Sequence, residues 1–324
     1  MAGYWYTQAI YVAAQLRLAD LLTDGPKAAD ELAPATGTSA RPLYRLLRAL
    51  ASVEIFAEDS QRRFSLTPLA ECLRSEVPGS LWSMAILRGG LQYEAWGQLL
   101  HSVQTGQSAF EKLHGLPIFE YFQQHAEDGK LFDAAMTGVH GRETAAMLDA
   151  YDFSDIGTLA DIGGGNGSVL TAILQKYPAM QGILFDLPGV VERARANLEA
   201  SGLSDRCRVV GGNFFEAVPP GADAYLMRHI IHDWDDEKSL TILRNCRKAM
   251  GGAEKLLVVE GVVLPDNQPS ISKFFDLAMM VLPGGMERTE DEYRRLSEAA
   301  GFRLTRIVPT KTWISVIEGE VSSA

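Results

Sequence analysis

The sequence predicts an α/β protein whose later two-thirds forms a Rossmann-like, doubly wound sheet, preceded by a mostly helical domain of winged-helix outline. Three observations lead to this fold class. Short apolar runs alternate with helical stretches after residue 156, a glycine-rich loop follows the first of those runs, and the first hundred residues carry apolar positions at helical spacing. The length of 324 residues is enough for about two domains of roughly 150 residues each.

Composition and charge exclude several classes of protein. With 47% hydrophobic and 22% charged residues, the chain is close to the average for soluble globular proteins. No apolar run reaches the roughly 18 residues of a membrane span, and no basic leader opens the chain, so we expect a cytoplasmic protein without a membrane partner. The formal net charge of −11 disfavours nucleic acid as a partner. Cys72, Cys207 and Cys246 form no CxxC pair, which predicts neither a disulfide framework nor a zinc site.

The N-terminal domain, residues 1–103, is predicted as helix, helix, hairpin. The first helix is expected to end at the Gly25-Pro26 pair. Ser39 is the expected N-cap of the second helix, and residues 54–67 predict a short hairpin. This order of elements is the outline of a winged helix.

A winged helix could bind DNA through the arginines of its second helix, but three arginines on a leucine-rich helix more often form its solvated face. The first helix carries more aromatic surface than a thin domain readily covers, which predicts a partner subunit over it. The arginines are Arg41, Arg45 and Arg48, and the aromatic residues are Tyr4, Trp5, Tyr6 and Tyr11.

The second domain, residues 104–324, begins with a helical stretch to about residue 150 and continues as alternating strands and helices. Strands separated by helices of this length build a parallel sheet, and the last two strands are expected to close one edge in antiparallel fashion. The predicted strands are residues 158–162, 182–186, 207–210, 223–227, 255–260, 302–308 and 312–317.

The glycine loop after the first of these strands is the strongest local signal. Gly163, Gly165 and Gly167 satisfy a G-x-G-x-G spacing, whereas a dinucleotide fingerprint would need glycine or alanine where the chain has Ser168. The spacing therefore disfavours NAD. A lone glycine loop is weak support, so the following strand ends matter.

Polar residues end the next two strands in the order that an adenosine site requires. Asp186 at the end of the second strand can take both ribose hydroxyls, and Asn213 with Phe214 after the third can hold an adenine. Taken singly, Asp and Asn at strand ends are common turn formers. Together they predict an adenosine site along the carboxyl edge of the sheet, and with the glycine spacing they favour S-adenosylmethionine over NAD.

Six motifs in order resemble the S-adenosylmethionine-dependent small-molecule O-methyltransferases of the plant caffeate type and their bacterial relatives, over the whole chain. The resemblance implies a methyltransferase sheet in residues 104–324 and a winged-helix dimerisation domain in residues 1–103, hence a homodimer. The motifs are DIGGGNGS, FDLPGVV, GGNFFEAVP, MRHIIHDWDDEKSLTILRNC, VVEGVVLP and GGMERTEDEY.

The same resemblance assigns the cofactor residues. Asn213 departs from the plant pattern, which commonly has Asp there, but keeps an acceptor oxygen. Arg228 falls where plant members carry a cofactor-contacting Lys. The implied contacts are Gly163 and Gly165 with the methionine part, Asp186 with the ribose, Asn213 and Phe214 with the adenine, and Arg228 with the cofactor.

For the chemistry, the resemblance places a general base at His232 and two flanking acids at Glu260 and Glu287. A phenol has a pKa near 10, so an imidazole beside it is a sensible proton acceptor. Glu260, at the end of a strand, is expected to reach the imidazole and fix its tautomer, and Glu287 to do so from the other side. As alternatives to these catalytic roles, His232 could be a core histidine whose hydrogen bonds are satisfied, and Glu287 could be a solvated carboxylate. His229, three residues before His232, could share a helix face with it, but HxxH without a third ligand does not support a metal.

Met136, Met279 and Met280 are expected to line the acceptor pocket, since methionine adapts to flat aromatic ligands, although it also fills cores. The expected reaction is methyl transfer to a phenolic or enolic hydroxyl of a small aromatic or polyketide-like metabolite. Two alternatives stay open: the same fold and cofactor used for N- or C-methylation, hydroxylation or decarboxylation, and a winged-helix regulator with an inert cofactor domain.

Overall fold

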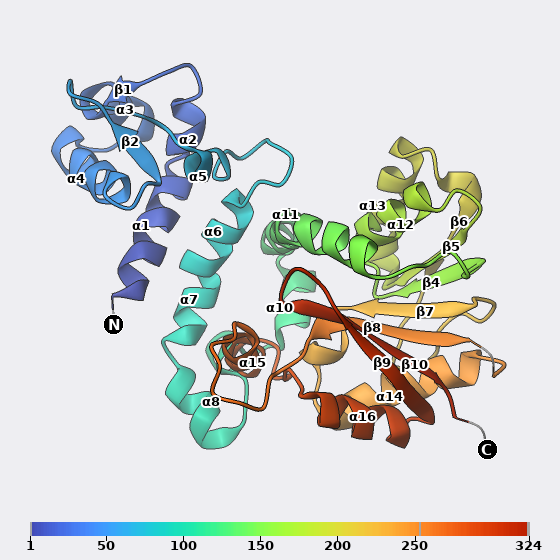
Figure 1. The fold of residues 1–324 in the computed structure, drawn as a ribbon. Helices are drawn as coiled ribbons and strands as arrows, with labels where there is room; N and C mark the ends of the chain where they lie inside the picture. Colours follow the sequence, from blue (N-terminus) through green and yellow to red (C-terminus); the bar gives the residue numbers. More distant parts are fainter. Residues whose placement is uncertain (1, 253, 323–324) are drawn as a thin grey trace. The chain divides into compact units, whose positions relative to one another are not determined.

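The computed structural model describes residues 2–252 and 254–322 and divides into two compact units (Figure 1). The first comprises Met1–Gln98 and Phe119–Gly141, and the second Leu99–Ile118 and Arg142–Ala324. Because each unit draws on two stretches of the chain, the domain boundary after residue 103 stays a prediction. Among the described residues, no helix has both the length and the apolar character that crossing a membrane requires.

The first unit contains the predicted helices and hairpin. A three-stranded antiparallel sheet, in the order β1-β3-β2, lies beside the early helices. Leu43, Leu47 and Leu50 form the buried face of α4, and Ser39 precedes the helix as expected. The elements are α1 (Gly3–Gln15), α2 (Leu18–Leu21), β1 (Lys27–Ala28), α3 (Ala29–Thr36), α4 (Ala40–Ala51), β2 (Phe56–Glu58), β3 (Arg63–Leu66), α5 (Pro68–Glu71), α6 (Trp82–Gly89) and α7 (Leu91–Trp96).

The predicted end of the first helix is wrong. The helix does not run to the Gly25-Pro26 pair, because Arg17 adopts a left-handed conformation (φ 50°) between α1 and α2. That conformation breaks the helical hydrogen-bond ladder. The Arg17 guanidinium lies over the Trp82 ring, 5.1 Å from its centroid. This cation–π contact favours the left-handed conformation over continuation of the helix.

The aromatic residues of α1 divide into two groups. Tyr4, Trp5 and Tyr6 are at least half exposed, as expected of a surface that a partner covers. Tyr11 instead packs within the unit: a Cβ at Gly89 would lie 2.2 Å from Cβ of Tyr11, so only glycine lets α6 approach α1 so closely.

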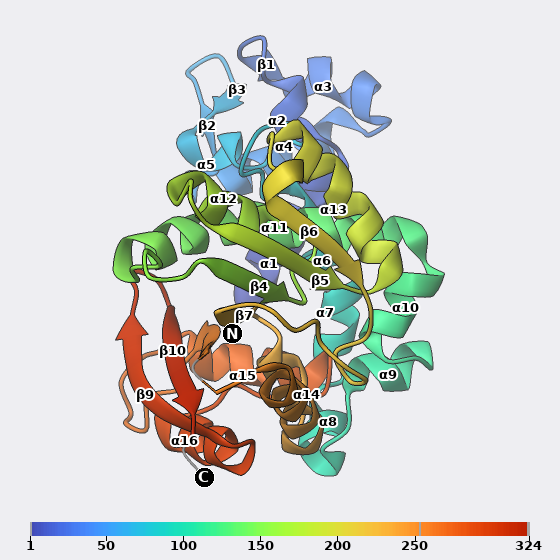
Figure 2. The ribbon, with the colours of Figure 1, turned by 90° about the vertical axis from the view of Figure 1, so that its right-hand side faces the viewer.

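The second unit is built on a seven-stranded sheet in the order β6-β5-β4-β7-β8-β10-β9 (Figures 1 and 2). The first five strands are parallel, and β10 is antiparallel to both neighbours. All seven predicted strands are confirmed, six of them with both ends within one residue, whereas the last begins two residues later and ends four residues later than predicted. They are β4 (Thr158–Ile162), β5 (Gln181–Asp186), β6 (Cys207–Gly211), β7 (Ala224–Arg228), β8 (Lys255–Gly261), β9 (Phe302–Pro309) and β10 (Ile314–Val321).

Helices cover both faces of this sheet (Figure 2), and each face has its own apolar core. One core joins the sheet to α12 and α13, and the other joins it to α14 and α16. Burial on both faces explains why the strands are nearly continuous apolar runs. The helical elements are α8 (Leu99–Thr105), α9 (Ala109–His114), α12 (Ser168–Lys176), α13 (Pro188–Ala200), η1 (Ser204–Arg206), η2 (Ile231–Asp233), α14 (Asp236–Ala249), α15 (Ser272–Val281) and α16 (Glu290–Ala299).

Two helices span the junction of the units in sequence, α10 (Ile118–Gln124) and α11 (Ala126–Ala150). They confirm the helical prediction for the stretch up to residue 150. Within the second unit, parallel pairing puts the carboxyl ends of β4, β5, β7 and β8 at one edge of the sheet. Ligands of open α/β sheets bind at that edge.

Candidate active site

The glycine loop joins β4 to α12, and its alternate glycines need their special backbone. Gly163, Gly165 and Gly167 have φ of 73°, 57° and 78°, a region that residues with a Cβ rarely adopt. At Gly163 a Cβ would also lie 2.4 Å from Cδ1 of Ile230, whereas at Gly165 it would meet no atom within 4 Å. The loop therefore presents bare backbone to open space at Gly165, ahead of a helix N-terminus.

Asp186, at the end of β5, is tied to this loop. Its Oδ2 accepts the Gly165 N–H at 2.8 Å and its Oδ1 accepts the Leu187 N–H at 2.7 Å. The carboxylate thus lies beside the open backbone, where the predicted ribose contact requires it. The ribose contact itself stays a prediction.

Asn213 and Phe214 follow β6 at the same edge. The Asn213 Oδ1 accepts the Phe215 N–H at 3.0 Å. This side chain therefore stabilises a local turn, which was the alternative to a role in binding the adenine. The Phe214 ring contacts the edge of Trp234 with ring centroids 6.2 Å apart, and it lies 3.8 Å from where a Gly163 Cβ would be. The structure therefore brings Phe214 to the glycine loop.

Arg228, the last residue of β7, is buried among protein groups. Its Nη1 donates to Thr144 Oγ1 at 2.6 Å, and its Nη2 lies 3.8 Å from the Glu143 carboxylate. Burial lowers the pKa of Arg228, and the charges of Glu143 and Asp161 counteract this. Burial raises the pKa of Asp161 to about 7. The predicted contact of Arg228 with the cofactor remains a prediction.

Glu260 holds the backbone of the turn that carries His232. Its Oε1 accepts the N–H groups of Ile230, Ile231 and His232 at 3.1, 2.6 and 3.2 Å. The expectation that Glu260 reaches the imidazole is therefore wrong. The reason is that η2 turns its N–H groups toward the end of β8, and a carboxylate buried there must satisfy them.

Two residues that sequence reasoning missed complete this frame. Tyr293 donates its hydroxyl to Glu260 Oε2 at 2.7 Å. Arg288, 1% exposed, donates to the carbonyls of Ile231 and Trp234 at 3.2 and 3.0 Å. The turn is therefore held by its N–H groups on one side and by its carbonyls on the other. The one available signal was the position of both residues within the GGMERTEDEY motif.

His232 lies in η2 with its ring buried against Glu287. The ring Nδ1 is 2.7 Å from Glu287 Oε1, and Nε2 is 3.6 Å from Asp233 Oδ1. Burial lowers the pKa of His232, but Asp233, Glu287 and Glu260 outweigh it and raise the pKa to about 10. Burial raises the pKa of Asp233 to about 7 and also raises that of Glu287. Glu287 is 4% exposed, so it is not the solvated carboxylate that was its alternative.

The Gly284-Gly285 turn brings Glu287 to the histidine. A Cβ at Gly285 would lie 2.1 Å from the His232 carbonyl oxygen, and that oxygen accepts the Met286 N–H at 2.9 Å. The two backbone segments therefore contact each other directly, and only glycine permits the approach.

The three predicted acceptor residues lie on two helices. Met279 and Met280 are half-buried on α15, and the Met279 carbonyl accepts the Gly284 N–H at 2.8 Å. Met136 lies in the part of α11 that belongs to the first unit. Their contact with an acceptor stays a prediction.

Comparison with known proteins identifies the family. An O-methyltransferase domain matches residues 96–303, and an O-methyltransferase dimerisation domain matches residues 1–76. The chain is 46% identical to the phenazine O-methyltransferase PhzM of Lysobacter antibioticus, covering 98% of this chain and 93% of that protein. It is 38% identical to the mitomycin biosynthesis 6-O-methyltransferase of Streptomyces lavendulae, covering 95% and 89%.

Solved structures agree. The crystal structure of LaPhzM superposes with a TM-score of 0.95 at 46% identity, covering 98% of this chain and 96% of that one. CalO1, a methyltransferase of calicheamicin biosynthesis solved in its SAH-bound form, gives 0.86 at 36% identity, covering 99% and 96%. The chain belongs to the O-methyltransferase family, and it is an S-adenosylmethionine-dependent enzyme. The open backbone at Gly165, with Asp186 beside it and Phe214 near Gly163, fits that cofactor.

Proposed function

We propose that this enzyme transfers a methyl group to a phenolic or enolic hydroxyl of a small aromatic or polyketide-like metabolite, with His232 as the general base. The observation that carries the proposal is the buried His232 ring, held through Nδ1 by Glu287 at 2.7 Å, at the sheet edge that bears the glycine loop. Two relatives are named as a phenazine O-methyltransferase and a mitomycin biosynthesis O-methyltransferase, and these names support an aromatic acceptor.

S-adenosylmethionine supplies a methyl group already activated on a sulfonium, so the protein must position and ionise the acceptor oxygen. With Nδ1 bonded to Glu287, the Nε2 atom of His232 is the one that faces an acceptor. A phenol has a pKa near 10, and the pKa of His232 is raised to about 10. At neutral pH the ring is therefore mostly protonated, so it must release its own proton before it can accept one from the acceptor. Once the ring is neutral, its pKa matches that of a phenol, and the proton passes between the two groups on nearly equal terms.

The cofactor would be held by the edge of the sheet. The backbone at Gly163 and Gly165 would face its methionine part, Asp186 its ribose, and Asn213 with Phe214 its adenine. Arg228, which also donates to Thr144 and lies near Glu143, would contact the cofactor as well. The dimerisation domain at residues 1–76 supports a homodimer, with Tyr4, Trp5 and Tyr6 in the contact.

Incubating the purified enzyme with labelled S-adenosylmethionine and a panel of phenols and hydroxyquinones tests the proposal. We expect a product that has gained one methyl group on oxygen, located by NMR, and an equal amount of S-adenosylhomocysteine. A methyl group found on nitrogen or carbon, or a product that is hydroxylated or decarboxylated instead, would contradict it. Binding to DNA at physiological salt without turnover would favour the regulator alternative.

A further inference from the structure

Four rings of the second unit form one continuous stack that ends at His232. Phe275 of α15 stacks on Trp313 with centroids 4.3 Å apart and planes at 19°. Trp313 stacks on His229 at 5.5 Å and 24°, and His229 stacks on His232 at 5.0 Å and 30°. One face of the His232 ring therefore rests on the ring of another histidine.

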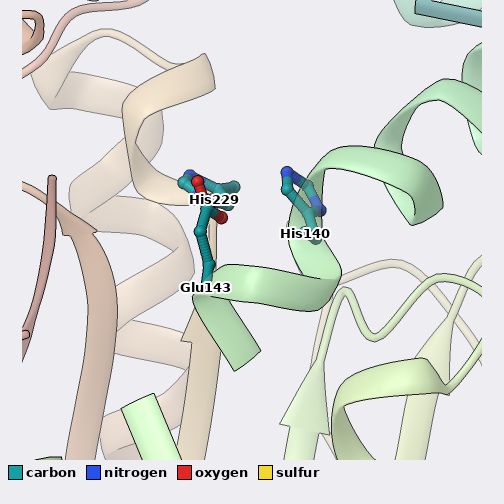
Figure 3. Close-up of side chains that lie close together, drawn as sticks. All are labelled: His140, Glu143 and His229. Atoms are coloured by element: carbon teal, nitrogen blue, oxygen red, sulfur yellow. The ribbon is translucent and has the colours of Figure 1, made fainter. Parts of the chain in front are cut away.

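Glu143 of α11 holds the two middle rings of the stack. Its Oε2 lies 2.9 Å from Nε2 of His229, and its Oε1 accepts the Trp313 Nε1–H at 2.7 Å. Figure 3 shows the Glu143 side chain extending from α11 to the His229 ring. Burial, assisted by the charges of His232 and Arg228, lowers the pKa of His229 well below its ordinary value. The neutral ring then donates its Nε2–H to the carboxylate.

The backbone of His229 shows that this placement is enforced. The residue follows β7 with φ of 54°, a left-handed conformation that only a few per cent of non-glycine residues adopt, asparagine, aspartate and histidine more often than the others. The expectation that His229 and His232 could share a helix face is therefore wrong, because His229 lies between β7 and η2, outside any helix, and His232 lies in η2. Such strained positions persist only where the surroundings fix them, and they cluster at functional sites.

We propose that His229 is a positioning residue for His232, its flat ring keeping the His232 imidazole in the plane where Nδ1 meets Glu287. This inference rests on the proposed function, in which His232 accepts the acceptor's proton. One hydrogen bond at Nδ1 leaves the ring free to tilt about that bond. Stacking on His229 removes this freedom, and Glu143 with Trp313 keeps His229 from rotating away.

Three variants test the proposal. His229→Asn keeps a residue that tolerates the left-handed backbone and removes the ring. His229→Phe keeps a flat ring without the bond to Glu143, and Trp313→Phe keeps the stack but removes the Nε1–H donor. Lys311→Ala is the matched control. Lys311 lies on the same loop as Trp313, between β9 and β10, and its side chain is 86% exposed.

Two measurements are made on each variant. Steady-state kinetics should show kcat about ten- to a hundredfold lower for His229→Asn, with KM for the cofactor within about twofold of the wild type. Partial recovery is expected in His229→Phe, and full activity in Lys311→Ala. Nitrogen-15 NMR of the imidazoles, without acceptor, should show the His232 Nδ1–H signal lost or broadened in His229→Asn, the signal being assigned by its absence from His232→Asn.

A wild-type kcat together with an unchanged His232 Nδ1–H signal in His229→Asn would overturn the proposal. The NMR measurement needs no turnover, so it decides the positioning role even if the enzyme methylates no hydroxyl. If circular dichroism shows that His229→Asn does not fold, Trp313→Phe decides: a smaller loss of kcat with a broadened signal supports the proposal, and wild-type behaviour in both measurements overturns it.

Discussion

Glu287 Oε1 lies 2.7 Å from Nδ1 of His232, and this one contact joins two segments that are 55 residues apart in the chain. Because it engages Nδ1, the nitrogen that would take a proton from an acceptor in the proposed reaction is Nε2, which lies 3.6 Å from Asp233 Oδ1. Orienting carboxylates of this kind also stabilise the imidazolium that forms when the ring takes a proton.

Replacing Glu287 by Gln should lower the pKa of His232. The wild-type pKa is raised to about 10, with Glu287 among the causes, so the wild-type ring stays charged from its ordinary pKa near 6.5 up to that value. In the variant we expect the ring to lose its proton at a lower pH. Titration of the imidazole signals by NMR, in the wild type and in the variant, measures this. An unchanged titration of His232 would show that Glu287 does not act on the ring.

Replacing His232 by Ala should lower kcat by about 10²–10⁴-fold, the range that general-base catalysis typically supplies. Cofactor binding should change little, because the ring hydrogen-bonds Glu287 and stacks on His229, and neither residue is proposed to hold the cofactor. Kinetics on a phenolic acceptor and calorimetric titration with S-adenosylhomocysteine measure the two effects. His125→Ala serves as the control. A variant with the full wild-type rate would mean that positioning alone drives the reaction.

Replacing Tyr293 by Phe should destabilise the fold by about 1–3 kcal/mol, since the buried Glu260 loses the donor to its Oε2 at 2.7 Å. The loss should appear in the free energy of unfolding measured in urea. Tyr6→Phe is a matched control because that tyrosine is half exposed. Equal stability of the two variants would contradict the view that Tyr293 supports the frame around η2.

Replacing Gly285 by Ala should destabilise the protein by about 1–3 kcal/mol, the usual cost of overpacking, and should also lower kcat. The added Cβ would lie 2.1 Å from the His232 carbonyl oxygen, so one backbone segment must move. Gly189→Ala in α13 is the control, because a Cβ there meets nothing within 4 Å and alanine favours a helix. Thermal unfolding of both variants measures the difference. A Gly285→Ala protein as stable as the control would show that the two segments are not tightly packed.

The sheet and the glycine loop could be predicted because their signals are local. Strands buried on both faces are apolar runs, and the glycines at 163, 165 and 167 are spaced as the turn requires. The end of α1 could not be predicted, because a left-handed Arg17 has no signature in its neighbours.

Of the two acids around His232, the contact of Glu287 with the ring was predicted correctly and that of Glu260 was not. The resemblance placed Glu260 and Glu287 near the base, and Glu287 does contact the ring. That Glu260 would bind three backbone N–H groups depends on the direction in which η2 turns after β7, which no pattern in the sequence states. The roles of Tyr293 and Arg288 depend on that same turn, and they became visible only with its geometry.

The order of strands in the sheet has a consequence for biosynthesis. β10 lies between β8 and β9, so during translation β8 keeps an open edge until α15, α16 and β9 have all emerged from the ribosome. Unpaired strand edges invite association with other chains. The carboxyl end of β8 bears Glu260, so the strand that holds the N–H groups of η2 gains its second neighbour only when β10 has been made and has inserted between β8 and β9.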